Sequence, residues 1–164
     1  MSNPPDAKIY LQKLQTVAYV NLGFPLLFFM YSYLESSVEQ LEAVVPDNYL
    51  YVVLTAAVLI SAISIVWSFK KYKSFLSRAV KKSELKEKLY LYRSANNYRF
   101  IIYGFIAWLL SFSFYFTNHQ PLAAIFGILL VLFSINNPSS RKIVIELQLK
   151  NQDKEIILKG LEIP

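Results

Sequence analysis

Long stretches without charge alternate with short charged segments along this chain. Positions 14–34, 48–69 and 100–140 contain no Asp, Glu, Lys or Arg, and nearly all of their residues are apolar or aromatic. About 20 apolar residues in a helix cross a hydrocarbon core roughly 30 Å thick. The first two stretches therefore predict one transmembrane helix each, and the third is long enough for two.

These lengths predict an all-α membrane protein, a four-transmembrane-helix bundle that forms a single membrane domain over residues 1–164. We expect the spans at about 14–34, 49–69, 100–117 and 121–136. The turn between the last two spans ends at Pro121, and proline is well tolerated at the first position of a helix. The first stretch is too long for the apolar part of a cleaved signal peptide, so we expect it to remain as a span.

Helical spacing continues beyond the second and third spans. Tyr72 and Leu76 share one apolar stripe, and Leu85 and Leu89 share another. Apolar residues three or four positions apart lie on one face of a helix. The pattern predicts cytoplasmic helical extensions of helices 2 and 3, which form a hairpin over residues 70–99 at the membrane surface.

The tail at 137–164 allows two interpretations. Asn137-Pro138 marks a break after the fourth span. Beyond the break, Ile143, Ile145 and Leu147 alternate as in a strand, whereas the four-residue spacing of Ile143 and Leu147 suits a helix. The apolar pattern alone leaves the choice open.

Charge predicts the orientation in the membrane. Residues 70–99 hold ten Lys and Arg against two Glu, a net charge of +8, whereas residues 35–48 hold four acidic residues and no base, a net charge of −4. Lys and Arg near the ends of spans stay on the cytoplasmic side. We therefore expect the hairpin, the tail and both termini in the cytoplasm.

The composition narrows the chemistry. The chain is 55% hydrophobic and has no cysteine, so it offers no thiolate ligand. The predicted spans contain no Asp, Glu, Lys, Arg or His, and proton-coupled transporters need such a group inside the membrane. The sequence also lacks a glycine-rich phosphate loop, a histidine pair and a Ser-His-Asp set. We predict that the protein is not an enzyme and binds no cofactor or metal.

Two groups of residues are candidates for binding. Bases near the predicted inner ends of the spans would contact anionic lipid headgroups: Lys70, Lys71, Lys73, Arg78, Arg99, Arg141 and Lys142. We expect the long side chain of Arg99 to extend to the lipid phosphates. Polar residues within or beside the spans would bond between helices or line a pore: Asn21, Ser61, Ser64, Asn96 and Ser111.

A pattern over residues 83–158 combines the segment LKEKLYLYRSA at 85–95, Arg99, two spans with a short turn, Asn137-Pro138 and the segment ELQL at 146–149. This pattern resembles a family of small, functionally uncharacterised four-span bacterial membrane proteins. The resemblance implies a short helical C-terminal tail, in which Asn151 caps a last helix through Leu158. It also implies the inner (cytoplasmic) membrane of a bacterium as the location. It supplies no catalytic or binding residue.

Three functions fit these features. We favour a non-enzymatic structural or accessory subunit that works through helix contacts in an oligomer or larger membrane complex, because small residues at helical spacing let helices approach closely. The alternative is a small oligomeric channel or uncoupled transporter, lined by Asn21, Ser61, Ser64, Ser111 and Ser113. An enzyme of lipid metabolism would use the basic surface, but no catalytic carboxylate is apparent. The expected partners are membrane lipids and other membrane subunits or further copies of this chain, and not nucleic acid.

Overall fold

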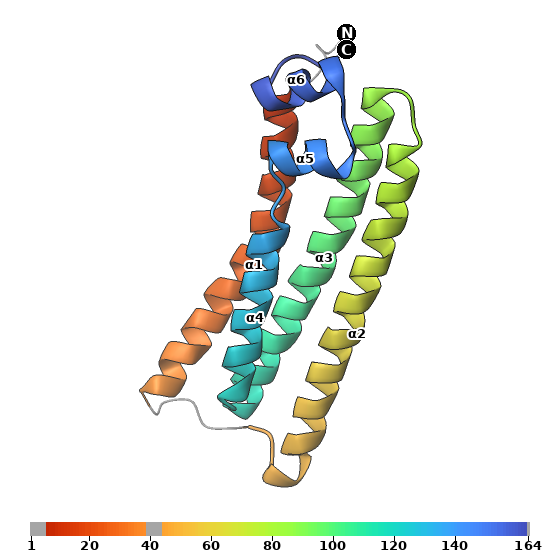
Figure 1. The fold of residues 1–164 in the computed structure, drawn as a ribbon. Helices are drawn as coiled ribbons and strands as arrows, with labels where there is room; N and C mark the ends of the chain where they lie inside the picture. The colour runs from red at the N-terminus through yellow and green to blue at the C-terminus, as the bar shows by residue number, and fades with distance from the viewer. Residues whose placement is uncertain (1–5, 39–43, 164) are drawn as a thin grey trace. The chain divides into compact units, whose positions relative to one another are not determined.

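The protein was analysed as a computed structural model, which describes residues 6–38 and 44–163. Six helices make up most of these ranges (Figure 1): α1 (Ala7–Ser37), α2 (Asp47–Val80), α3 (Leu85–Thr117), α4 (Pro121–Asn136), α5 (Ser140–Glu146) and α6 (Asn151–Lys159). Within the described ranges there is no strand, only an isolated bridge between Asp6 and Glu162. The all-helical prediction is confirmed, and the tail is helical rather than a strand.

Three helices are long and apolar enough to cross a membrane: α1, α2 and α3. Helix α4 has 16 residues, so it is about 24 Å long, which is less than a hydrocarbon core of roughly 30 Å. It qualifies as a span only if it is counted together with α5, beyond the break at 137–139. The described residues therefore contain three candidate spans, or up to four if the broken pair is counted as one.

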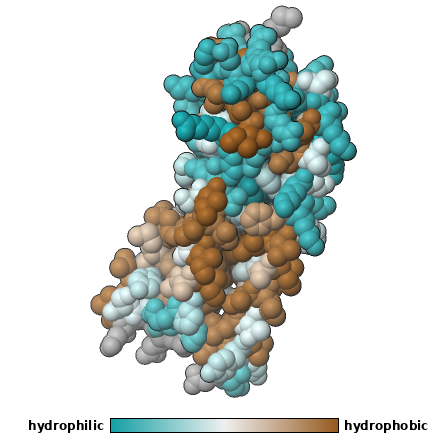
Figure 2. Space-filling view, in the orientation of Figure 1, coloured by the Kyte–Doolittle hydropathy of each residue, from teal (hydrophilic) through white to brown (hydrophobic). Residues whose placement is uncertain are grey.

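The chain divides into two compact units. Unit 1 comprises residues 6–19, 68–99 and 137–163 of the described chain, and unit 2 comprises residues 20–67 and 100–136. Helices α1, α2 and α3 each contribute to both units. Figure 2 shows mostly hydrophilic residues over unit 1 and mostly hydrophobic residues over unit 2.

Unit 1 has a hydrophobic core built from five helices. Its buried members include Leu14 of α1, Ala79 of α2, Leu89 of α3, Ile143 of α5 and Ile156 of α6. Both arms of the predicted hairpin are helical, because α2 continues to Val80 and α3 begins at Leu85. Their apolar stripes face this core and so meet segments that are remote in the sequence.

The two tail helices begin differently. At α5 the Ser139 hydroxyl accepts a hydrogen bond from the backbone N–H of Lys142 at 3.3 Å, which is an ordinary N-cap. At α6 the N-cap position is Lys150, without a side-chain bond, so the implied cap by Asn151 is wrong. Asn151 is already helix residue one and has a φ of 49°. Asparagine tolerates this left-handed conformation better than most residues, which explains its place at the tight turn.

Unit 2 is held by a close approach of α1 and α3. A Cβ atom at Gly104 would lie 2.8 Å from the carbonyl oxygen of Asn21, so only glycine fits there. Farther along, the Ser111 hydroxyl lies 3.1 Å from the carbonyl oxygen of Pro25. Aromatic rings fill the remaining space, as where Phe29 stacks on Phe126 with centroids 4.1 Å apart. The small residues thus bring two helices of the same chain together.

Candidate functional site

Unit 1 encloses a polar cluster between three helices. It consists of Tyr72 of α2, then Tyr92, Asn96 and Arg99 of α3, and Glu146 of α5, and we call these five residues the tyrosine–arginine cluster. All are buried except Glu146, which is partly buried. Buried polar groups are costly unless they are paired, so the contacts inside the cluster indicate its role.

Arg99 lies inside the cluster with 1% of its surface exposed. Its guanidinium carbon is 3.9 Å from the centre of the Tyr72 ring, and Nη2 donates to Asn96 Oδ1 at 2.7 Å. The Asn96 amide donates to the carbonyl oxygen of Tyr92 at 2.9 Å. The expectation that Arg99 extends to lipid phosphates is therefore wrong, because an aromatic face and an amide hold its charge inside unit 1.

Glu146 joins the tail to the hairpin. Its Oε2 accepts hydrogen bonds from the hydroxyls of Tyr72 at 2.5 Å and Tyr92 at 2.9 Å. Burial raises the pKa of Tyr92 above its usual value of 10.0, and the nearby Tyr72 and Glu146 add to the increase. Burial also raises the pKa of Tyr72, although the charge of Arg99 opposes the increase. Both phenols therefore stay protonated at neutral pH and act as donors to the carboxylate.

Lys142 shares the electrostatic environment of this cluster. Burial and the charge of Arg99 lower the pKa of the Lys142 ammonium, whereas Glu146 raises it. Lys142 is partly buried. Its candidacy as a headgroup contact is therefore weaker than that of the fully exposed bases.

The geometry of the cluster suits holding elements together. One carboxylate oxygen joins α5 to α2 and α3 through two phenols, and the cation of Arg99 packs on one of those phenols. The described residues contain no group of three or more His, Cys, Asp or Glu that could hold a metal ion. We interpret the tyrosine–arginine cluster as a structural contact that holds α5 against the hairpin formed by α2 and α3.

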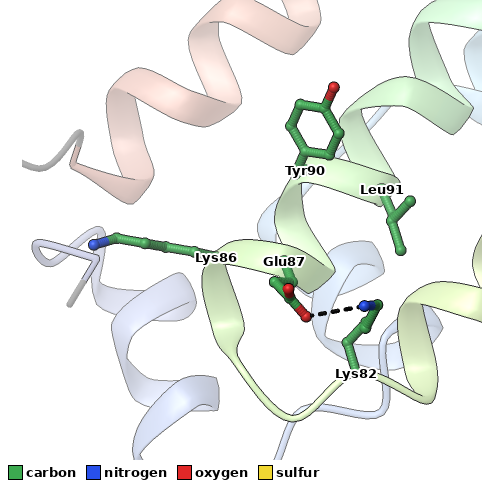
Figure 3. Close-up of a pocket in the computed structure, with 5 residues that line it drawn as sticks. All are labelled: Lys82, Lys86, Glu87, Tyr90 and Leu91. Atoms are coloured by element: carbon green, nitrogen blue, oxygen red, sulfur yellow. Dashed lines mark ion pairs between the residues drawn. The ribbon is translucent and has the colours of Figure 1, made fainter.

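Two open grooves border the hairpin. The first measures about 340 Å³, and Figure 3 shows the side chains that line it: Lys82, Lys86, Glu87, Tyr90 and Leu91. In it, Lys82 Nζ pairs with Glu87 Oε2 at 3.2 Å across the connection between α2 and α3. The second groove measures about 370 Å³ and is lined by Lys73, Leu76, Ser77, Val80, Lys81, Glu146 and Gln148. Each groove combines lysines with apolar side chains.

The other predicted site residues fall into two groups. The exposed bases, which remain accessible, are Lys70, Lys71, Lys73, Arg78 and Arg141. The polar residues of unit 2 lie within it: Ser61 and Ser111 are buried and donate to the carbonyl oxygens of Ala57 and Ala107, both at 2.7 Å. Asn21 and Ser64 are partly buried, and Ser113 is buried.

Sequence reasoning missed Glu146 as a functional contact. The residue lies in an apolar segment, where it is the sole acid between residues 137 and 149. A single carboxylate among apolar residues indicates a group that needs hydrogen-bond donors, and this was the signal in the sequence that could have identified Glu146. Its partners could not be named, because Tyr72 and Tyr92 lie 74 and 54 residues away in the chain.

No known protein family, curated protein or solved structure matches this chain.

Proposed function

We propose that this chain is a non-enzymatic integral membrane protein that acts as a structural or accessory subunit through helix contacts in an oligomer or larger complex. The observation that carries the proposal is the apolar part of α2. Only 11% of its most apolar window is buried within the chain, compared with 56% for α3. A helix with so little cover from its own chain is available to helices of other subunits.

The exposed side chains of α2 suit this role. In unit 2 its described buried residues are Ala57 and Ser61, while Tyr51, Val52 and Ile63 are 75%, 64% and 63% exposed. Water would penalise this apolar surface, whereas lipid and apolar helices would not. Neighbouring subunits could pack there with little loss of solvation.

On this proposal the protein crosses the inner membrane of a bacterium four times, with both termini in the cytoplasm. The charge difference of +8 against −4 supports the orientation. The fourth crossing would be α4, although α4 counts as a candidate span only when it is taken together with α5. The exposed bases at the end of the second span, Lys70, Lys71 and Lys73, would contact anionic headgroups.

The runner-up is an oligomeric channel, and the contacts of its candidate lining residues disfavour it. The Ser61 and Ser111 hydroxyls bond to backbone carbonyls inside unit 2. Asn21 lies against Gly104. Hydroxyls bonded within a buried interface do not line a water-filled pore. An enzyme of lipid metabolism is disfavoured because two carboxylates beside the basic surface are already paired: Glu146 accepts two tyrosine hydroxyls, and Glu87 pairs with Lys82.

Gentle solubilisation followed by mass determination of the intact assembly tests the subunit role. We expect a multiple of the 19.0 kDa chain or additional proteins. Replacing Val52 and Ile63 by Trp should reduce that mass, because bulky residues would obstruct neighbours on the exposed face. Phe112→Trp on α3, where Phe112 is also exposed, is the matched control. A single chain under conditions that preserve other complexes would contradict the proposal.

Two further measurements test topology and the channel. A reporter active only outside the cytoplasm should work after Ser37 and fail after Lys82 and Ile163. Vesicles reconstituted with the protein should show no solute flux. A selective flux that disappears in Ser64→Leu would promote the channel.

A further inference from the structure

We propose that the tip of the hairpin is a docking surface for an acidic, partly apolar segment of a partner protein. We define the hairpin tip as Lys81, Lys82, Lys86, Glu87, Tyr90 and Leu91. The proposal rests on the accessory function above and deepens it, because it states the chemistry of a partner on the cytoplasmic side.

The lysines of the hairpin tip are remote from the bases at the end of the span. Helix α2 is continuous from Asp47 to Val80, and Val80 lies ten residues, about 15 Å, beyond Lys70. Headgroups extend roughly 5–8 Å beyond the hydrocarbon core. The tip is thus farther from Lys70 along the helix than one Debye length, which is roughly 8 Å. Attraction to anionic lipid therefore acts mainly on Lys70, Lys71 and Lys73.

The surface of the tip has the features of a protein contact. Tyr90 is 71% exposed beside Lys86 and Leu91, and exposed tyrosines are enriched at interfaces. The groove that they line is about 340 Å³, enough to receive an apolar side chain. Orientation in the membrane requires only bases near the span, and it requires neither an exposed tyrosine nor a groove.

The first groove combines lysines with apolar side chains, which favours an acidic peptide with apolar residues over a polyphosphate that has no apolar group to place there. Glu87, which also lines this groove, pairs with Lys82 at 3.2 Å. Lysines at the rim would meet acidic side chains, and the apolar floor would meet an apolar one.

The test measures binding to the full chain held in bilayer discs of neutral phosphatidylcholine. The probe is a fluorescein-labelled peptide in which pairs of glutamate alternate with single leucines, and binding is followed by anisotropy. The comparison probes are the same peptide with serine for leucine, oligothymidylate of equal charge, and vesicles of phosphatidylglycerol. We expect the leucine peptide to bind most tightly and to weaken as salt increases.

Charge and aromatic variants locate the contact. Lys86→Glu should weaken peptide binding about tenfold, and Tyr90→Ala should weaken it by a similar factor. Lys154→Glu makes the same change of charge at an exposed site on α6 of the same unit and should have little effect. All of these residues are exposed, so the thermal transition should not move and loss of folding would not confuse the result.

The outcomes separate this proposal from the function on which it rests. Tighter binding of oligothymidylate, equal losses in Lys154→Glu, or binding lost only when Lys70 and Lys71 are reversed would each overturn the docking surface. If the peptide does not bind but the assembly has a multi-subunit mass, the docking surface at the hairpin tip would be wrong and the accessory function would stand. Peptide binding at the tip together with a single-chain mass would overturn the membrane complex and leave the tip intact.

Discussion

The two units share three helices but expose opposite kinds of residue. In unit 1 large apolar side chains such as Leu89 and Ile143 are buried and lysines are exposed. In unit 2 large residues such as Phe114 and small ones such as Gly104 are both buried, while many large apolar residues on α2 are exposed. The difference follows from the solvent: water drives large apolar groups inward, whereas lipid rewards only close packing.

The largest expected effect tests the core of unit 1. Leu89→Ala should lower the free energy of unfolding by about 2–5 kcal/mol, because Leu89 is 3% exposed and its removal leaves a cavity. Leu59→Ala, the same change at a 55% exposed site in unit 2, should cost about 0.5 kcal/mol or less. Denaturant titration in detergent gives both values. Equal losses of unfolding free energy in the two variants would show that the two units do not differ in how they treat large apolar side chains.

The next effect tests the close approach in unit 2. Gly104→Leu should cost about 1–3 kcal/mol, because the added side chain collides with the Asn21 backbone. A Cβ at Gly127 meets no atom within 4 Å, so Gly127→Leu is the matched control and should change little. Thermal unfolding in detergent compares the variants. If both leucine variants behave alike, small residues do not hold α1 to α3.

A smaller effect concerns the tyrosine–arginine cluster. Tyr92→Phe should cost about 1.5 kcal/mol, the low end for a hydrogen bond to a charged group. The folded pKa of Tyr92 is raised above 10.0, so the unfolded chain loses this proton first and stability falls as pH increases above 10. Tyr92→Phe should reduce that alkaline slope. Tyr90→Phe, at an exposed position, should change neither quantity.

The measurement for this cluster is the free energy of unfolding between pH 8 and pH 11, with hydrogen exchange to assign the change to α5. Identical alkaline slopes in the wild type and Tyr92→Phe would show that this phenol does not couple folding to pH.

The smallest expected effect is at Asn21. Asn21→Ala keeps the Cβ next to Gly104 and removes only the amide, so we expect a loss of about 1 kcal/mol or less, the scale of polar contacts between helices in membranes. Thermal unfolding measures it. A loss as large as that of Gly104→Leu would mean that polar bonding, and not close packing, dominates unit 2.

The sequence predicts the burial of a residue best when the pattern that indicates it lies within one helix, and worst when its contacts come from distant parts of the sequence. Gly104, Ala107 and Ser111 are small residues at helical spacing in the third predicted span, and all three are buried. The expectation that Arg99 extends to lipid phosphates is wrong. It rested on the position of Arg99 beside a predicted span, whereas Tyr72 and Asn96 enclose its guanidinium group. The cap at Asn151, which the resemblance implied, is wrong because the N-cap of α6 is Lys150.

The sequence by itself determined the helices and the candidate spans. Stretches without charge are a property of composition, and in lipid a helix must satisfy its own backbone bonds, so local sequence suffices. Only the tertiary structure decided what the apolar stripes meet and how Glu146 joins the tail to the hairpin. Periodicity identifies the face that packs, but a contact between residues 74 positions apart exists only once the chain has folded.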